Sequence, residues 1–411
     1  MFTSRSTHSL TKPRRAASTA AFALAALLAG CGGGGGGGHH PVPPPPPPPP
    51  VNLGPLYDFA PIGLPGMTYG EVDRRGIATS MRVTGTGRDA AGNARAFYYN
   101  GKETIDLGTF GGPDARAYSI NRCGEIAGWA QEKNGLAHAF HYDGTLNDLG
   151  TLGGAESFGF AISTCGKVAG WSRTVSGETH AFFRDNAGMR NLGTLGGSAS
   201  YALAMNGVGQ VVGYAYGPGN AWYHAFLYDA RTGAPIQDLG SLGDFSMAVD
   251  INDAGKIIGN ARVADGVLNA FCWEAGTMSN LGLLPGARSA EARALNGAGL
   301  IVGNMTYPDG RQVAFLHDGT TLHGLGTLGG SSFSNAVAIN GTGLVVGSSV
   351  DPAANAEHAV AWSSSYGLVD LNTRVRNLPA GIVLVAALAV ADDGGIAVMT
   401  NKGLGVLRPR N

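Results

Sequence analysis

Charged residues are scarce in this sequence: they make up 14% of its 411 residues, against about 25% in typical soluble proteins. The formal net charge is −1, which argues against a nucleic-acid binder, because such proteins need clustered Lys and Arg to displace counterions. No Gly-x-Ser-x-Gly elbow, phosphate loop or zinc pattern occurs in the sequence. The chain therefore carries no catalytic motif of these kinds.

Long apolar runs are also missing, whereas glycine is abundant. The apolar segments 16–28 and 381–390 are both shorter than the roughly 20 residues that cross a bilayer as a helix. Glycine accounts for 67 residues, about twice its average usage. Few charges and many glycines favour short strands joined by tight turns. We therefore interpret 381–390 as a buried strand.

The first 30 residues have the arrangement of a secretory signal. A basic region precedes the apolar run 16–28, which leads into Leu28-Ala29-Gly30-Cys31. This last segment resembles a bacterial lipobox, and the resemblance implies that Cys31 becomes the first mature residue and carries lipid. An ordinary signal peptide or a transmembrane helix is the alternative. We predict a lipoprotein signal peptide over 1–30 and membrane attachment through Cys31.

A segment of low complexity follows over residues 31–55. It contains Gly32 to Gly38 and Pro43 to Pro50. Such a composition cannot bury a core, and its proline run favours an extended polyproline II rod. His39 and His40 make a poor metal site because they have no partners nearby in the sequence. We interpret 31–55 as a tether between the lipid and a folded domain over 56–409.

The rest of the chain repeats one unit about every 44 residues. Its clearest marker, Leu107-Gly108-Thr109-Phe110-Gly111-Gly112, recurs from Leu149, Leu192, Leu239 and Leu325, and more loosely from Leu281. Most copies also contain an Asn-x-x-Gly turn, in which Asn bonds its own backbone and Gly supplies a positive φ. Five-residue segments rich in β-branched or aromatic residues lie between the turns. Each unit is thus predicted to form four antiparallel strands.

Units of this length and composition, repeated about eight times, predict an all-β fold, a β-propeller of four-stranded blades. Residues 56–60 are expected to form the last strand of a unit, whereas the final unit stops after three strands, the third near 404–407. Pairing the two ends would complete an eighth blade. We therefore predict eight blades; seven blades and an open solenoid are the alternatives.

The third strand of several units begins with His-Ala-Phe, as at His138, His180 and His224. Together with the Leu-Gly-Thr-Leu-Gly-Gly marker, this resembles the HAF-type extracellular repeat family, over about residues 56–409. The resemblance implies an exported bacterial protein, and it supplies neither an activity nor catalytic residues. The last unit departs most, because Asp392-Asp393-Gly394-Gly395 replaces its Asn-x-x-Gly turn.

Two columns of repeated polar residues are candidates for chemistry. The first contains His138, His180, His224 and His358; the second contains Asp106, Asp148, Asn191, Asp238, Asn280 and Asp370. A metal ring would need nitrogens at about 2.0–2.1 Å from one ion, but equivalent positions on neighbouring blades should lie too far apart. Paired acids could hydrolyse sugars, but one acid per blade favours a turn lock. We predict structural roles for both columns.

Cys123 and Cys165 occupy the same turn position in adjacent units. Export permits a disulfide, and the pair is a candidate if the Cα atoms lie within about 7 Å. The alternative is that both are small residues filling a turn. Cys272 is expected to be a lone buried thiol.

One position breaks the repeat. The residue after the glycine of the second strand is Met81, Trp129, Trp171 and Tyr214 in the first four units, but Asn260, Asn304, Ser348 and Thr400 in the last four. Aromatic side chains suit stacking on sugars or apolar partners. Trp129, Trp171 and Tyr214 are therefore a candidate ligand-contact face; packing between blades is the alternative.

These observations predict a monomeric, non-catalytic lipoprotein of the bacterial cell envelope, at the outer membrane or cell surface. Its propeller would bind or scaffold a glycan or an envelope protein, with no cofactor, no metal and no nucleic acid. A propeller enzyme acting on polysaccharide, as a glycosidase or lyase, and a purely structural surface protein are the alternatives.

Overall fold

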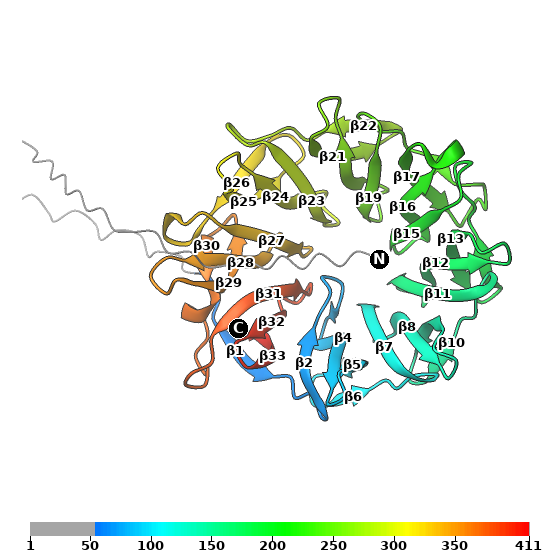
Figure 1. The fold of residues 1–411 in the computed structure, drawn as a ribbon. Helices are drawn as coiled ribbons and strands as arrows, with labels where there is room; N and C mark the ends of the chain where they lie inside the picture. The colour runs from blue at the N-terminus through cyan, green and yellow to red at the C-terminus, as the bar shows by residue number, and fades with distance from the viewer. Residues whose placement is uncertain (1–53, 411) are drawn as a thin grey trace, which may run out of the picture. The chain divides into compact units, whose positions relative to one another are not determined.

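A computed structural model describes residues 54–410, which form eight antiparallel sheets in a ring (Figure 1). The fold is an eight-bladed β-propeller, as predicted; the seven-bladed alternative is wrong. The signal peptide, Cys31 and most of the predicted tether lie outside the described residues. Among the described residues, no helix is long and apolar enough to cross a membrane.

The blades are numbered along the chain, and the first strand of each lies nearest the central channel. Blades 1 to 4 consist of β2 (Met67–Glu71), β4 (Arg82–Asp89), β5 (Ala94–Tyr99) and β6 (Thr104–Asp106); β7 (Gly111–Ile120), β8 (Ile126–Glu132), β9 (Ala137–Tyr142) and β10 (Leu146–Asp148); β11 (Gly153–Ile162), β12 (Val168–Thr174), β13 (Thr179–Asp185) and β14 (Gly188–Asn191); β15 (Ser200–Met205), β16 (Gln210–Tyr216), β17 (Tyr223–Asp229) and β18 (Gln237–Asp238). Blades 5 to 8 consist of β19 (Ser246–Ile251), β20 (Ile257–Arg262), β21 (Leu268–Glu274) and β22 (Thr277–Asn280); β23 (Ser289–Leu295), β24 (Ile301–Thr306), β25 (Gln312–His317) and β26 (Leu322–Gly326); β27 (Ser334–Ile339), β28 (Val345–Asp351), β29 (Ala356–Ser363) and β30 (Gly367–Asp370); β31 (Leu384–Val390), β32 (Ile396–Thr400), β33 (Gly403–Pro409) and β1 (Tyr57–Pro61). The short strand β3 (Ile77–Ala78) pairs with β4, and three 3-10 turns, η1 (Pro218–Asn220), η2 (Leu328–Gly330) and η3 (Leu371–Thr373), lie between strands.

The ring closes by pairing the two ends of the described chain. The strand β1 is the outer strand of blade 8 and pairs with β33, with Tyr57 opposite Pro409 and Pro61 opposite Gly405. Tyr57 and Phe59 are buried in the same cluster as Leu407. The predicted closure is confirmed, and the segment 381–390 supplies the inner strand β31.

Six of the eight blades are packed around a phenylalanine of the third strand, whereas blades 7 and 8 have Val360 and Gly405 at that position. In six blades this ring is fully buried: Phe97, Phe140, Phe182, Phe226, Phe271 and Phe315. The residue opposite Phe140 on β8 is Gly128. A Cβ atom at Gly128 would clash with the Phe140 ring and with the carbonyl oxygen of Arg116 on β7. Glycine at this position therefore lets the inner strand β7 and the Phe140 ring pack closely against β8. This explains why the glycine of the second strand and the His-Ala-Phe segment of the third recur at a constant spacing.

The asparagines of the Asn-x-x-Gly turns join neighbouring blades. In Asn296 the Oδ1 atom accepts from the Leu300 backbone within its own turn, at 2.9 Å, and Nδ2 donates 3.0 Å to the Asn340 carbonyl of the next blade. The same donation to the next turn is made by Asn121, Asn206, Asn252 and Asn340. The predicted turn role is confirmed, and the bond between blades is a second role.

Candidate ligand-binding cavity

A cavity of about 730 Å³ lies at the centre of the ring. Its walls come from side chains of the inner strands β7, β11, β15, β19, β23 and β27, including Tyr118, Phe160, Leu203, Glu291 and Asn335. This volume falls within the roughly 300–1,000 Å³ of typical small-ligand sites. The inner strands therefore enclose enough space for a small ligand.

The loop 72–75, between β2 and β3, lines the cavity and is here called its floor. Arg75 donates 2.9 Å to the Leu203 carbonyl and 2.8 Å to the Asp250 carboxylate. Arg74 donates 2.6 Å to the Val249 carbonyl. These acceptors belong to blades 4 and 5, and blade 5 stands four places from blade 1 in a ring of eight. The two arginine side chains thus link blade 1 to blades 4 and 5 on the other side of the ring. Residues 77–79, which follow the loop, line a second hollow of about 320 Å³ beside the Asn-x-x-Gly turns.

The two arginines have different electrostatic surroundings. Burial alone would raise the pKa of Asp250, but the charges of Arg75 and Arg74 hold that pKa below its ordinary value. The Asp250 charge raises the pKa of Arg75 against the effect of burial. Burial, followed by the adjacent Arg75 charge, lowers the pKa of Arg74 to about 10. The positive charge of Arg75 is therefore balanced by the paired Asp250 carboxylate. Arg74 is also charged at neutral pH, and it lies beside the cavity.

Aromatic side chains form one continuous chain along blades 2 to 5. Ring centroids lie 5.4 Å apart for Trp129 and Phe158, and 4.2 Å apart for Phe158 and Trp171. The chain continues through Tyr201, Tyr214, Tyr223 and Phe245, with successive centroids 4.7–5.9 Å apart. Three of these contacts cross a blade boundary, namely Trp129–Phe158, Trp171–Tyr201 and Tyr223–Phe245, and the other three lie within a blade. The chain thus packs the blades together, and its last two rings, Tyr223 and Phe245, line the cavity.

The predicted contact residues Trp129, Trp171 and Tyr214 lie in this chain, but they do not line the cavity. Four other rings line it: Tyr118, Phe160, Tyr223 and Phe245. Trp129 supports this lining indirectly, since its Nε1 donates 3.2 Å to the Tyr118 hydroxyl. The position that breaks the repeat is therefore a contact between blades, and the lining rings stand on the inner strands or near the rim.

The strand register corrects two of the residues predicted to follow the glycine of the second strand, Met81 and Thr400. In blade 1, Thr86 pairs with Glu71 as Trp129 pairs with Arg116, so Thr86 and not Met81 is equivalent to Trp129. Met81 instead lies in a turn with a φ of 61°. In blade 8 the equivalent residue is Met399 rather than Thr400, because Met399 pairs with the inner strand at Ala386. The repeat is irregular at both places, and the aromatic run at this position covers blades 2 to 4.

In the polar part of the ring, amides replace the aromatic contacts. Asn260 accepts 2.8 Å from the Ala292 backbone amide on the next blade. Asn304 does the same with Ala336, at 2.9 Å. Both asparagines are buried. The same position therefore joins blades by hydrogen bonds in one part of the ring and by ring stacking in the other.

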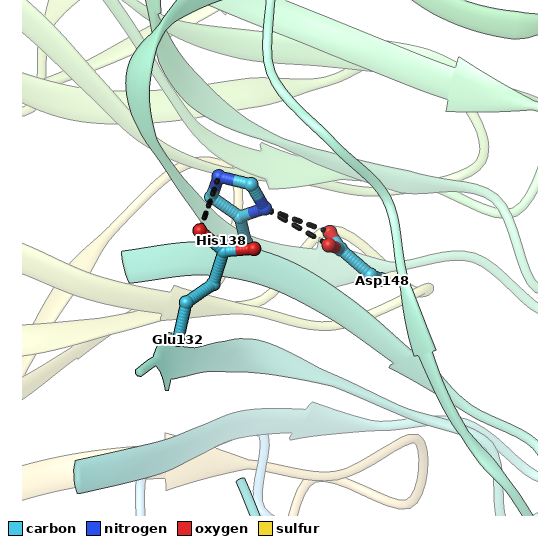
Figure 2. Close-up of side chains that lie close together, drawn as sticks. All are labelled: Glu132, His138 and Asp148. Atoms are coloured by element: carbon cyan, nitrogen blue, oxygen red, sulfur yellow. Dashed lines mark hydrogen bonds and ion pairs between the residues drawn. The ribbon is translucent and has the colours of Figure 1, made fainter. Parts of the chain in front are cut away.

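The histidine and acid columns meet at the outer part of the blades. His138 Nδ1 lies 2.9 Å from an Asp148 oxygen, with Glu132 on its other side at 3.8 Å (Figure 2). Asp148 also accepts 2.7 Å from the backbone of Gly150. The same pairing joins His180 to Asn191, His224 to Asp238, and His358 to Asp370. The pairs tie the third strand to the turn after the fourth, as predicted.

Two of these places combine residue types that bind metals, namely Glu132, His138 and Asp148, and Asp351, His358 and Asp370. In the first, the two ring nitrogens of His138 face different carboxylates. The same bond from the histidine to the acid or amide recurs in four blades of this chain and holds the third strand to the fourth. A structural role therefore explains the geometry of both clusters.

The cysteines do not form the candidate disulfide, and the alternative of small residues in turns describes them. Cys123 and Cys165 are free and exposed, so the candidate disulfide is not formed in this structure. Both occupy the outer corners of Asn-x-x-Gly-type turns, as small residues in a turn would. Cys272 is buried, and burial raises the pKa of its thiol.

The loop 72–75 and Asp250 are functional candidates that the repeat did not reveal. Their signal is nevertheless present: Asp73-Arg74-Arg75-Gly76 replaces the regular turn of the other units. The connection between the paired residues Glu71 and Thr86 has 14 residues, against 12 between Arg116 and Trp129. An insertion carrying two arginines in a chain with few charges marks the loop.

Comparisons with known proteins find distant structural similarity and no family. No protein-family model matches the chain, and no curated protein matches it significantly. The chain is similar to the β-propeller domain of the Trilobed protease from Pyrococcus furiosus, at 10% identity and a TM-score of 0.45, over 84% of this chain and 96% of that one. A puromycin-hydrolyzing peptidase from Mycobacterium tuberculosis gives 12% identity and a TM-score of 0.47, over 80% of this chain and 57% of that one. TolB from Acinetobacter baumannii gives 13% identity and a TM-score of 0.36, over 73% and 77%.

At these identities no activity is transferred from those proteins. The eight-bladed assignment rests on the sheets of this chain. The resemblance to the HAF-type repeat family stays a prediction.

Proposed function

We propose that this protein is an exported, lipid-anchored and non-catalytic β-propeller that binds a ligand in its central cavity. The observation that carries the proposal is the cavity itself: it has aromatic walls and, among the described residues, one lining arginine, Arg74, with no carboxylate within 4 Å. Open concave sites with a few convergent polar groups are the usual places of ligand binding. Export and the lipid on Cys31 rest on the signal sequence, and the cell envelope is the proposed location.

The alternative enzyme would need a pair of carboxylates, one acid and one base or nucleophile, at the cavity. The lining contains Asp73 and Glu291. Glu291 is occupied by Arg293, whose Nη2 lies 2.9 Å away, and Asp73 accepts from the Arg75 backbone. These contacts favour ligand binding over hydrolysis. The large aromatic and charged side chains of the lining also distinguish the cavity from a purely structural channel, which small residues would line.

The test is a screen of the full-length protein in detergent against envelope glycans and envelope proteins. A bulky substitution, Val337→Trp, fills the cavity from β27, and Val175→Trp is the control because Val175 is 85% exposed. We expect a ligand that wild type and Val175→Trp bind and that Val337→Trp loses, recovered unmodified after incubation. Equal binding by all three proteins, or a cleaved ligand, would contradict the proposal. Mass spectrometry of the mature chain should show lipid on an N-terminal Cys31.

A further inference from the structure

The floor of the cavity presents a cation with free hydrogen-bond donors. A guanidinium group carries five N–H donors, and Arg74 uses one of them for a hydrogen bond within the described residues, to the Val249 carbonyl. The other cavity arginines have carboxylates within 4 Å: Arg75 has Asp250, Arg262 has Asp244, and Arg293 has Glu291. Arg74 has no such partner in residues 54–410. It is therefore the side chain placed to bind an anion.

The walls of the cavity divide into an aromatic part and a polar part. The aromatic part, here called the aromatic wall, comprises Tyr118, Phe160, Tyr223 and Phe245. Tyr118 and Phe160 stack with centroids 4.9 Å apart, and Arg262 covers the Phe245 ring at 4.6 Å. Stacked rings present flat apolar faces that suit the C–H face of a sugar ring.

The polar part lies on β23 and β27. Glu291 and Arg293 form an ion pair, and each keeps hydrogen-bonding capacity beyond it. Asn335 accepts 2.6 Å from Asn304 through its oxygen, which leaves its own amide N–H groups for a ligand. Hydroxyl groups need such mixed donors and acceptors. A pyranose ring, with apolar faces and polar edges, matches a cavity built in this way.

We propose that the ligand of this cavity is an acidic saccharide, whose carboxylate binds the Arg74 guanidinium and whose pyranose ring stacks on the aromatic wall. The proposal rests on the proposed function and names the ligand class for the same cavity. Charge-assisted hydrogen bonds from an arginine to a carboxylate are strong, and the buried setting of Arg74 reduces screening by salt.

The test compares three probes in calorimetric titrations of the wild-type protein: digalacturonate, its methyl ester and galactobiose. The three share their ring and linkage chemistry and differ at the carboxylate. We expect digalacturonate to bind about 10-fold or more tightly than the other two, as expected for a hydrogen bond to a charged group. This comparison uses unaltered protein, so it does not depend on any variant folding.

The second arm uses Arg74→Gln, with Arg88→Gln as the matched control. Arg88 lies on the same blade and is exposed, and its guanidinium group donates to the Gly92 carbonyl of its own turn. Arg74→Gln should bring the affinity for digalacturonate down to that for galactobiose, and Arg88→Gln should leave it unchanged. Circular dichroism melting curves establish that both variants are folded before the titrations.

Two results would overturn the inference in different ways. Equal affinity of wild type for all three probes would reject the acidic ligand, while leaving a cavity that binds neutral sugars and so the proposed function intact. No binding of any saccharide, together with capture of another ligand that Val337→Trp loses, would reject the saccharide class and keep the cavity as the site. Loss of all binding in the cavity tests would reject both.

Discussion

Single residues in this propeller serve the turn and the neighbouring blade at once. Asn296 is buried, and its two side-chain atoms bond different turns. Ser163 stands at the equivalent position of blade 3, where its hydroxyl accepts from the Lys167 backbone. The serine holds its own turn, but it has no amide group for the next blade. The acceptor role within the turn and the donor role toward the next blade can therefore be tested separately.

Substituting Asn296→Asp should lower the free energy of unfolding by about 1–3 kcal/mol, because the turn acceptor is kept while the donor to Asn340 is lost and a buried carbonyl loses its partner. Denaturant titration monitored by tryptophan fluorescence measures the change. Asn100→Asp is the control, since Asn100 accepts only from its own exposed turn through Lys102 and Glu103. A loss no larger than that of the control would show that the bond between blades contributes nothing.

The aromatic chain gives a second prediction at this scale. Trp171 contacts Phe158 within its blade and Tyr201 across the boundary. Trp171→Ala should therefore cost about 3 kcal/mol of stability, as large-to-small aromatic substitutions do, and Trp171→Phe should recover most of it. A matched titration with the ligand should show little change in affinity for Trp171→Phe. A folded Trp171→Ala protein of wild-type stability that no longer binds would restore Trp171 as a contact residue.

At the scale of elements, the loop 72–75 and the strand pair β1–β33 hold the ring together in different ways. The loop ties blade 1 to the opposite side of the channel, whereas the strand pair closes the ring at its circumference. Each makes a distinct prediction about stability.

The loop predicts a pH dependence through Asp250. Its pKa is lower in the folded protein than its ordinary value of 3.8, so the ionised form stabilises the fold above that value, and the contribution is lost as pH falls through the folded pKa. Wild type should lose stability on acidification below about pH 4 more steeply than Asp250→Asn. At pH 7 Asp250→Asn should be less stable by about 3 kcal/mol, because Arg75 loses its partner. Parallel stability curves for the two proteins between pH 2 and 7 would contradict this account; thermal melts at each pH provide the comparison.

The strand pair predicts a specific cross-link. Asp58 lies opposite Arg408 in the register, and residues directly opposite in an antiparallel pair have Cβ atoms about 4.5–5.5 Å apart. Asp58→Cys with Arg408→Cys should oxidise within one chain and raise stability by about 3–5 kcal/mol, because it closes a very long loop. The pair Asp58→Cys with Arg173→Cys is the control, because Arg173 lies on β12 in blade 3. Peptide mass mapping that finds only bonds between chains would contradict the closure.

At the scale of the whole molecule, the repeat made the fold predictable and concealed the site. The glycine and phenylalanine recur together in six of the eight blades because the inner strand must approach closely, so their spacing reveals the repeated unit. The closing strand could be predicted because one strand at the start complements three at the end. The loop 72–75 was not found in this way. Val249, which accepts from Arg74, and Asp250, which pairs with Arg75, come from blade 5, and only the closed ring brings them to the loop.

The repeat also did not reveal which aromatic residues line the cavity. Trp129, Trp171 and Tyr214 were identified by their departure from the repeat as a candidate ligand-contact face, but they lie in the aromatic chain that packs the blades and do not line the cavity. Which face of each ring meets the neighbouring blade depends on strand register. Tyr118 and Phe160 line the cavity because they lie on inner strands, and neither occupies a position marked by the repeat.

The most direct test of ligand binding in the central cavity is a crystal structure of the protein with digalacturonate. The account predicts electron density for the sugar between the Arg74 guanidinium and the rings of Tyr118 and Phe160, with a carboxylate oxygen within about 3 Å of a guanidinium nitrogen. Density for the sugar on the outer surface of the ring, with the cavity unchanged, would contradict it.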